Sequence, residues 1–327
     1  MNNILICFLV FLSSLLLTVI VEKKILPILK SKAKQPIYEE GPSWHLSKSG
    51  TPTMGGVAFV GAISLTLLIS GLVTFFLLDN KDAGISIFLT LLFSLSNSLI
   101  GIFDDLTKLY RKKNAGLTPL QKIIFQTILA IIFLMSRRYF FEDGTIVNLS
   151  FLSFDLGVLY YPMALILILG IVNCANLTDG IDGLATSVGI TVGMVFLLLG
   201  QGASDITAII SSALIGGALG FLFFNAHPAK IFMGDTGSLF LGAIAIGLAF
   251  SMNEPTVIIP VGAVYVIEGV SVIIQVIVYK ITKKRIFKMA PLHHHLEKCG
   301  IEENRICVLA VIVTLIFSAI SLLIFRI

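Results

Sequence analysis

Long apolar runs recur from one end of this 327-residue chain to the other, and they constrain the fold more than any other feature. The runs are continuous, and most approach the roughly 20 residues that a helix needs to cross the hydrocarbon of a bilayer. Only helices and closed barrels satisfy their backbone polar groups in lipid, and barrel strands require alternating polarity. Just 13% of the residues are charged, compared with about a quarter in soluble domains. The sequence therefore predicts an all-α, polytopic integral membrane protein.

We expect ten transmembrane helices in a single domain that spans residues 1–327. The fifth, sixth and eighth spans are short for a bilayer, so their ends should extend into the flanking polar motifs. Only residues 79–82 separate the second and third spans, which favours a tight hairpin. Pro260 and Gly262 weaken the start of the ninth span and predict a bent helix there. The expected spans are 4–26, 54–78, 83–103, 120–136, 160–175, 184–199, 206–224, 237–252, 256–279 and 306–325.

Lys and Arg residues indicate the orientation, because they accumulate in cytoplasmic loops. Most fall in or beside the loops after the odd-numbered spans, and the opposite side carries Lys81, Arg137, Arg138 and Arg326. Both termini are therefore expected to be extracytoplasmic, with every polar motif facing the cytoplasm. The net charge of +4 is mostly juxtamembrane and requires only anionic membrane lipid as a partner. The chain shows no nucleic-acid-binding signature, and its four cysteines lack the spacing typical of a disulfide or zinc site.

Two adjacent carboxylates, Asp104 and Asp105, follow the third span at its cytoplasmic end. On a continuing helix Asp104 and Lys108 share a face, so a solvated ion pair is the simplest interpretation. Adjacent carboxylates also repel each other unless a cation compensates, which favours a site for a hard metal ion. The pair alone leaves both interpretations open.

A polar stripe follows the fifth span. Asn173, Asn176, Asp179 and Asp182 come at a spacing of three, which places them on one side of a helix, and Gly180 leaves its backbone accessible to a ligand. Asp182 alone would be explained as a cap of the next helix. Four polar groups on one stripe exceed what capping requires, so this segment is expected to bind a ligand.

The loop between the seventh and eighth spans runs from Asn225 to Ser238 and contains Phe232 and Asp235. Asp235 lies where a helix N-terminus begins, and such an end attracts anions such as phosphate. Two simpler interpretations remain open at this stage. Asp235 would then be only an N-cap, and Phe232 only an interfacial anchor instead of a ring that stacks on a flat base.

The last cytoplasmic loop contains His293, His294 and His295. Three consecutive histidines cannot all face one point on a helix, so we expect one or two to act chemically and the others to hold the loop. Imidazole can hydrogen-bond a diphosphate, whereas zinc sites prefer spaced ligands. Glu268 lies in the ninth span, and an intramembrane carboxylate is costly and usually paired. It either ties helices together or lines a groove for a lipid tail.

These motifs, together with Gly50-Thr51-Pro52-Thr53-Met54-Gly55-Gly56, resemble the MraY family of phospho-N-acetylmuramoyl-pentapeptide transferases. The resemblance covers nearly the whole chain in order. The wider superfamily of polyprenyl-phosphate N-acetylhexosamine-1-phosphate transferases shares the carboxylate motifs. The segment Pro291-Leu292-His293-His294-His295 is typical of the muramoyl-pentapeptide branch, so it indicates the substrate.

The resemblance implies a magnesium-dependent transfer of phospho-N-acetylmuramoyl-pentapeptide from UDP-N-acetylmuramoyl-pentapeptide to undecaprenyl phosphate. The products are lipid I and UMP, and the pathway is peptidoglycan biosynthesis for the cell wall. It also implies ten helices, a homodimer and a multi-pass location in the bacterial cytoplasmic (inner) membrane, with the active site facing the cytoplasm.

Matching motif positions carries the family's functional residues onto this chain. Asp235 resembles the main magnesium ligand, and Asp104 and Asp105 resemble catalytic carboxylates that share the metal. Further catalytic residues that the resemblance implies are Lys48, Lys122 and His294. Substrate-binding residues that it implies are Asn176, Asp179, Gly180, Ile181, Asp182, Asn225, Phe232, His293 and His295. The sequence leaves open whether Asp104 takes a proton, attacks as a nucleophile or orients the lipid phosphate.

Two other functions remain as alternatives. A sibling enzyme would transfer another N-acetylhexosamine phosphate from its UDP carrier to a polyprenyl phosphate. A transporter would bind ions with polar residues in broken helices, but those residues should lie halfway across the membrane. In this chain the carboxylates cluster at the inner helix ends.

Overall fold

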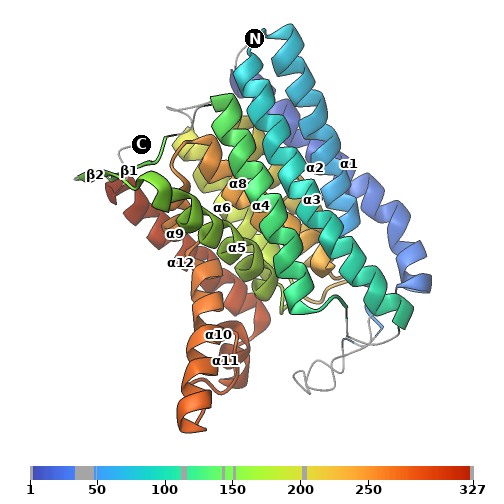
Figure 1. The fold of residues 1–327 in the computed structure, drawn as a ribbon. Coiled ribbons are helices and arrows are strands. Elements are labelled where there is room, and N and C mark those ends of the chain that lie inside the picture. The colour runs from blue at the N-terminus through green and yellow to red at the C-terminus, as the bar shows by residue number, and fades with distance from the viewer. Residues whose placement is uncertain are drawn as a thin grey trace.

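The computed structural model is a bundle of helices with one small β-hairpin (Figure 1). It describes residues 3–33, 48, 50–111, 116–141, 144–149, 152–200 and 205–324. The elements in chain order are α1 Asn3–Lys32, α2 Gly56–Leu72, the π-helical turn η2 Val73–Leu77, α3 Lys81–Arg111, α4 Pro119–Phe141, β1 Ile146–Leu149, β2 Leu152–Asp155, the 3-10 turn η3 Gly157–Leu159, α5 Tyr160–Thr178, α6 Leu184–Gly200, α7 Asp205–Asn225, α8 Gly234–Ser251, the 3-10 turn η4 Pro255–Val257, α9 Ile258–Val261, α10 Ala263–Thr282, α11 Leu292–Lys298 and α12 Glu303–Ile324.

The helices confirm the prediction of a polytopic, helical membrane protein. Within the described residues, nine helices are long and apolar enough to cross a membrane, and α6 is a shorter apolar helix of 17 residues. Each predicted span falls on one of these helices. The end of the last span at residue 325 and the outer Arg326 lie outside the described residues.

Several helices extend into the polar motifs, as the short spans led us to expect. α5 reaches Thr178 and α8 begins at Gly234, so both include motif residues. α3 continues well past the predicted boundary at residue 103 and carries the carboxylate pair as far as Arg111. Asp104 and Asp105 are buried in this extension of α3, whereas Leu106 and Tyr110 in the same stretch are exposed.

The turn between α2 and α3 is the tight hairpin expected at residues 79–82. The helix loosens into η2 before the turn, and Asp79 adopts a positive φ of 50°. Asn80 Oδ1 then accepts a hydrogen bond from Ala83 N at 3.1 Å, which satisfies a free donor in the first turn of α3.

The β-hairpin is a small feature that the sequence did not predict, and the fold remains all-α in class. β1 and β2 pair in antiparallel register, with Ile146 opposite Asp155 and Leu149 opposite Leu152. Four-residue strands are too short for their periodicity to stand out in a sequence dominated by helical runs. In Figure 1 the hairpin lies at the same end of the bundle as the start of α1 and the end of α12.

The ninth predicted span is interrupted near its start, at the position where Pro260 and Gly262 predict a bend. α9 ends at Val261, Gly262 leaves the helical region with φ −95° and ψ 28°, and α10 begins at Ala263. α10 then projects from the bundle with α11 beside it (Figure 1).

α8 lies at the centre of the bundle, and nearly all of its residues are buried. Its first turn crosses α3 at Gly101, where an added Cβ would stand 2.3 Å from the Asp235 carbonyl oxygen and 2.5 Å from Thr236 N. Small residues let helix backbones approach this closely in membrane proteins. Only glycine at position 101 therefore allows the end of α3 and the start of α8 to meet.

We predict that Gly101→Ala separates α3 from α8 and destabilises the protein, at a cost of about 1–3 kcal/mol for overpacking. Thermal unfolding of the purified protein in detergent measures the effect. Gly61→Ala is the matched control, because a Cβ at Gly61 would have no heavy atom within 4 Å. Equal unfolding midpoints for the two variants would contradict this role of Gly101.

Candidate active site

A cavity of about 1060 Å³ lies where α3 ends and α8 begins. Its walls combine α3, α4, α5 and α8 with connecting loops, so residues far apart in the sequence meet here. Most of the candidate residues from the sequence line it: Lys48, Asp104, Asp105, Lys122, Asn176, Asp179, Gly180, Ile181, Asp182, Asn225, Phe232, Asp235 and His294. His293 and His295 are not among the lining residues.

Three carboxylates, those of Asp104, Asp105 and Asp235, form a compact cluster at this cavity. One oxygen from each lies within 4.8 Å of the others. Asp104 and Asp105 are buried in the last turns of α3, and Asp235 is in the first turn of α8. The close helix crossing at Gly101 brings them together. Three converging carboxylates are a donor set that hard, oxygen-preferring cations such as Mg²⁺ favour.

Asp105 also fixes the start of α8. Its carboxylate accepts hydrogen bonds from Asp235 N at 3.1 Å, from Thr236 N at 2.9 Å and from Thr236 Oγ1 at 2.7 Å. The first backbone N–H groups of a helix have no partner within that helix. Asp105 therefore caps α8 from a neighbouring helix, and Asp235 is not the N-cap that the simpler interpretation proposed.

Two lysines compensate the carboxylate cluster. Lys108 Nζ lies 2.7 Å from Asp104 Oδ2 and 3.2 Å from Asp235 Oδ1. Lys122 Nζ lies 3.0 Å from Asp104 Oδ1 and also hydrogen-bonds Asp235 Oδ2. Lys108 was not among the predicted site residues, although its spacing of four from Asp104 was visible in the sequence. The ion pair between Asp104 and Lys108 forms as that spacing indicated. Lys108 also lines the cavity and pairs with Asp235 of α8.

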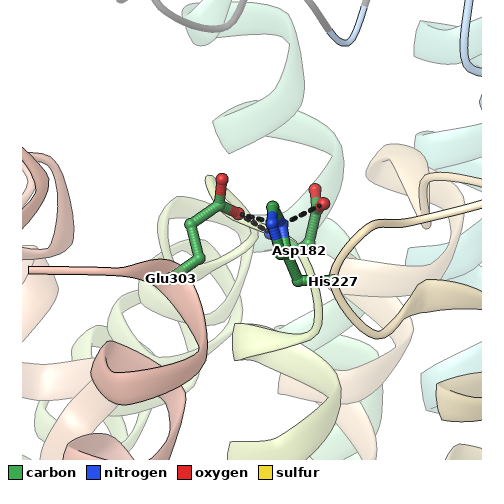
Figure 2. A group of neighbouring side chains, drawn as sticks. All are labelled: Asp182, His227 and Glu303. Carbon is green, nitrogen blue, oxygen red and sulfur yellow. Dashed lines mark hydrogen bonds and ion pairs between the residues drawn. The ribbon is translucent and has the colours of Figure 1, made fainter.

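A second charged cluster lies at the same cavity and centres on Asp182. Figure 2 shows Asp182, His227 and Glu303 converging from three different parts of the chain. Lys48 Nζ lies 2.8 Å from Asp182 Oδ1 and 2.7 Å from the Glu303 carboxylate. Asp182 Oδ2 accepts a hydrogen bond from Ala229 N at 3.0 Å and lies 3.0 Å from His227 Nδ1. The side chain of Asp182 thus joins separate loops, and its bonds are not those of a cap on α6.

Two asparagines in the cavity wall hold its shape. Asn225 is buried, accepts a hydrogen bond from Thr186 Oγ1 at 2.8 Å and donates to Ile231 O at 3.1 Å. Asn176 Nδ2 donates to Ser238 Oγ at 2.7 Å, which links α5 to α8. Both side chains therefore have structural partners in addition to their place at the cavity.

Phe232 belongs to a loop that is hydrogen-bonded to the segment Thr51–Gly55. Its backbone N donates to Pro52 O at 2.8 Å, and its carbonyl accepts from Gly55 N at 2.9 Å. Phe232 is one of the residues that line the cavity.

The three histidines have different surroundings, as expected for consecutive residues on the short helix α11. His294 lines the cavity and bonds Glu297 Oε2 through Nδ1 at 2.6 Å. His295 holds the preceding loop, because its Nδ1 accepts a hydrogen bond from Lys288 N at 3.1 Å. His293 is fully buried behind the cavity wall.

Glu268 is a buried carboxylate that we expected to be paired, and its partner is His293. Glu268 Oε2 lies 3.2 Å from His293 Nδ1 and accepts a hydrogen bond from His293 N at 3.3 Å. The ring packs on Gly180, where an added Cβ would stand 2.1 Å from Nε2. Glu268 therefore ties α10 to α11, and through His293 it supports the glycine of the polar stripe.

Asp179 lies between the two charged clusters. Burial raises the pKa of its carboxyl well above the usual range, and the nearby Asp235, Asp105 and Asp182 raise it further, whereas Lys108 lowers it. An ionised Asp179 is thus unfavourable in the protein until a cation or a hydrogen-bonding ligand joins it.

The helical architecture and the polar site at the helix ends define a class of membrane-embedded transferase, and comparisons with known proteins agree. Residues 85–253 match the model of glycosyl transferase family 4. Residues 48–60 match signature 1 of phospho-N-acetylmuramoyl-pentapeptide-transferase.

Curated relatives identify the family within this class of transferases. The chain is 43% identical to the phospho-N-acetylmuramoyl-pentapeptide-transferase of Bacillus velezensis, over 90% of each chain. It is 44% identical to that of Heliobacterium modesticaldum, over 84% of each, and 42% identical to that of Bacillus subtilis, over 91% of each. The chain belongs to the phospho-N-acetylmuramoyl-pentapeptide-transferase family, as the resemblance of its motifs had implied.

We predict that Asp179→Asn raises the thermal unfolding midpoint of the ligand-free protein more at pH 8 than at pH 5. The folded state keeps Asp179 protonated up to its raised pKa, whereas the unfolded chain ionises this residue above the ordinary pKa of 3.8. The stability of the wild-type protein therefore falls as the pH rises between these two pKa values, and Asn removes that loss. Unfolding of both proteins at the two pH values measures the difference. A larger stabilisation at pH 5 than at pH 8 would contradict the assignment.

Proposed function

We propose that this protein transfers phospho-N-acetylmuramoyl-pentapeptide from UDP-N-acetylmuramoyl-pentapeptide to undecaprenyl phosphate. The products are lipid I and UMP, as peptidoglycan biosynthesis requires. The single observation that carries the chemistry is the convergence of Asp104, Asp105 and Asp235 at the cavity. Relatives at 42–44% identity are named phospho-N-acetylmuramoyl-pentapeptide-transferases, which supports this choice of transferred group.

We further propose a topology of ten crossings, counting α6 and treating α9 and α10 as one interrupted span. Both termini would be extracytoplasmic, and the cavity would face the cytoplasm of a bacterium from its inner membrane. The distribution of Lys and Arg supports this orientation. A homodimer is proposed on the family resemblance alone.

Magnesium is the proposed cofactor, and Asp235, Asp104 and Asp105 would hold it. The donor set is hard oxygen, and the three carboxylates outnumber the two compensating lysines. When bound, Mg²⁺ would neutralise charge on the diphosphate and favour departure of UMP. Asp105 already receives three hydrogen bonds from α8, and Asp104 accepts one from Leu117 N at 2.7 Å. Asp235, the most exposed of the three carboxylates, is therefore the best placed to meet the ion.

The protein's own residues would position the two anionic reactants. An oxygen of the lipid phosphate attacks the sugar-linked phosphorus, the bond to the bridging oxygen breaks, and UMP leaves. The lipid phosphate has a second pKa of about 6, so it needs no strong base at neutral pH. Lys108 and Lys122 lie where they can bind phosphate oxygens, and Asp104 can orient the lipid phosphate or take its remaining proton.

The remaining contacts with the UDP-linked donor substrate would come from the polar stripe and from the opposite wall of the cavity. Asn176, Gly180, Ile181 and Asp182 line one side of the cavity, and Phe232 offers its ring for the uracil base. Lys48 and His294 would contact the diphosphate.

Two other functions agree less well with these observations. If the donor were another UDP-N-acetylhexosamine, the protein would be a sibling polyprenyl-phosphate transferase, but the Pro291–His295 motif and the curated relatives favour the muramoyl-pentapeptide donor. A transporter would need its carboxylates near the middle of the membrane. Here they lie at the end of α3 and the start of α8.

The test is UMP release by the purified protein with magnesium, undecaprenyl phosphate and the UDP-linked donor. We expect release with UDP-N-acetylmuramoyl-pentapeptide and none with UDP-N-acetylglucosamine. Turnover with UDP-N-acetylglucosamine and not with the muramoyl donor would favour the sibling enzyme.

Asp235→Asn is expected to lower kcat at least about 100-fold, because it removes one charge from the proposed metal site. Its fold should persist, since the Asp235 side chain bonds the lysines and not the backbone of α3. Asp105→Asn is a poorer test, because an amide NH₂ would face the donors of α8. EDTA should stop release by the wild-type protein, and added Mg²⁺ should restore it. Wild-type turnover by Asp235→Asn would refute the site assignment.

A further inference from the structure

The first residue of α12, Glu303, reaches the Asp182 cluster beside the cavity from a part of the chain that carries none of the sequence motifs. It lies 255 residues from Lys48 and 121 residues from Asp182 along the sequence. Its side chain is only 10% exposed. Figure 2 shows its carboxylate pointing toward His227 and Asp182.

Glu303 joins two segments of the donor site. One carboxylate oxygen, Oε2, accepts a hydrogen bond from Asp182 N at 2.9 Å, and so holds the backbone of the polar stripe. The same carboxylate lies 2.7 Å from Lys48 Nζ. His227 Nδ1 is 3.6 Å from Oε2, which places it at the edge of the cluster.

Lys48 is thereby held between two carboxylates. Asp182 Oδ1 lies 2.8 Å from its Nζ on one side, and Glu303 lies 2.7 Å away on the other. A lysine side chain has four rotatable bonds, so a single exposed ion pair would leave it poorly positioned. Two partners, both largely buried and both tied to the backbone of a loop or helix, restrict it to one place.

We propose that Glu303 is a positioning residue of the donor site, which acts by holding Lys48 against the loop of Asp182. This inference rests on the proposed function, because it assigns Lys48 to the diphosphate of the UDP-linked donor. Glu303 does not itself line the cavity. It governs donor affinity through Lys48, and it makes the start of α12 part of the nucleotide site.

A purely structural role is the competing explanation. In that case Glu303 would only fasten α12 to residues 179–183, and its loss would affect stability and both substrates alike. Glu303→Gln separates the two explanations, because the amide oxygen can still accept the bond from Asp182 N while the negative charge that attracts Lys48 is lost.

Glu302→Gln is the matched control. Glu302 precedes Glu303 directly, carries the same charge and is 75% exposed, and its ion-pair partner among the described residues is the exposed Arg305 at 3.5 Å. Any effect of charge near the start of α12 as such would appear in both variants. An effect transmitted through Lys48 would appear only in Glu303→Gln.

The first measurement is UDP binding to the full-length protein in detergent with Mg²⁺, by isothermal titration calorimetry. We expect Glu303→Gln to weaken UDP binding about tenfold, a change of roughly 1.4 kcal/mol, and Glu302→Gln to change it less than twofold. In a Lys48→Gln background, Glu303→Gln should cause no further loss. UDP binding that is unchanged in Glu303→Gln, or losses that multiply in the double variant, would overturn the proposal.

The second measurement is steady-state UMP release. Glu303→Gln should raise the KM for the UDP-linked donor about tenfold, with less than a twofold change in the KM for undecaprenyl phosphate and an unchanged thermal unfolding midpoint. Equal changes in both KM values, or loss of the folded state, would support the structural explanation and overturn ours. If the wild-type protein bound UDP but released no UMP, the proposed function would fail while the binding test of Glu303 would stand.

Discussion

The hydrogen bonds from the first turn of α8 to Asp105 of α3 are the interaction on which the rest of the site depends. They form only because Gly101 lets the two helices touch, and they place Asp235 beside Asp104. A helix start that lies inside a membrane protein cannot rely on water for its free N–H groups. The bundle satisfies these groups with a carboxylate, and the same carboxylate completes a candidate metal site.

Charge compensation organises the rest of the cavity. Lys108 and Lys122 neutralise most of the Asp104–Asp105–Asp235 cluster, and Lys48 neutralises much of the cluster of Asp182 and Glu303. Both acidic clusters are therefore held by lysines that can also bind phosphate oxygens. Burial and the charges of Asp235, Asp105 and Asp182 raise the pKa of the Asp179 carboxyl more than Lys108 lowers it.

The sequence alone was sufficient for the helices and for much of the site. Continuous apolar runs indicated the spans, and the placement of Asp104, Asp179, Asp235 and His294 beside alternate spans predicted their convergence, which the cavity confirms. The spacing of Pro260 and Gly262 likewise predicted the break before α10.

The remaining features depend on contacts that a sequence pattern does not contain. Glu303 is one of two adjacent glutamates, and only the fold distinguishes it from the exposed Glu302. His293 and His294 are adjacent too, yet one is buried against Glu268 and the other faces the cavity. For Lys108 the helical spacing was a usable signal, but its second partner, Asp235, lies 127 residues away. The β-hairpin was too short to give a periodic signal.

Manganese binding followed by electron paramagnetic resonance tests the central claim most directly, because it detects a hard divalent cation without requiring turnover. We expect the wild-type protein to bind Mn²⁺ in competition with Mg²⁺, Asp235→Asn to lose this binding, and Asp182→Asn to keep it, since Asp182 is not one of the three carboxylates that converge at the proposed magnesium site. Undiminished Mn²⁺ binding in Asp235→Asn, or its loss in Asp182→Asn alone, would contradict the account.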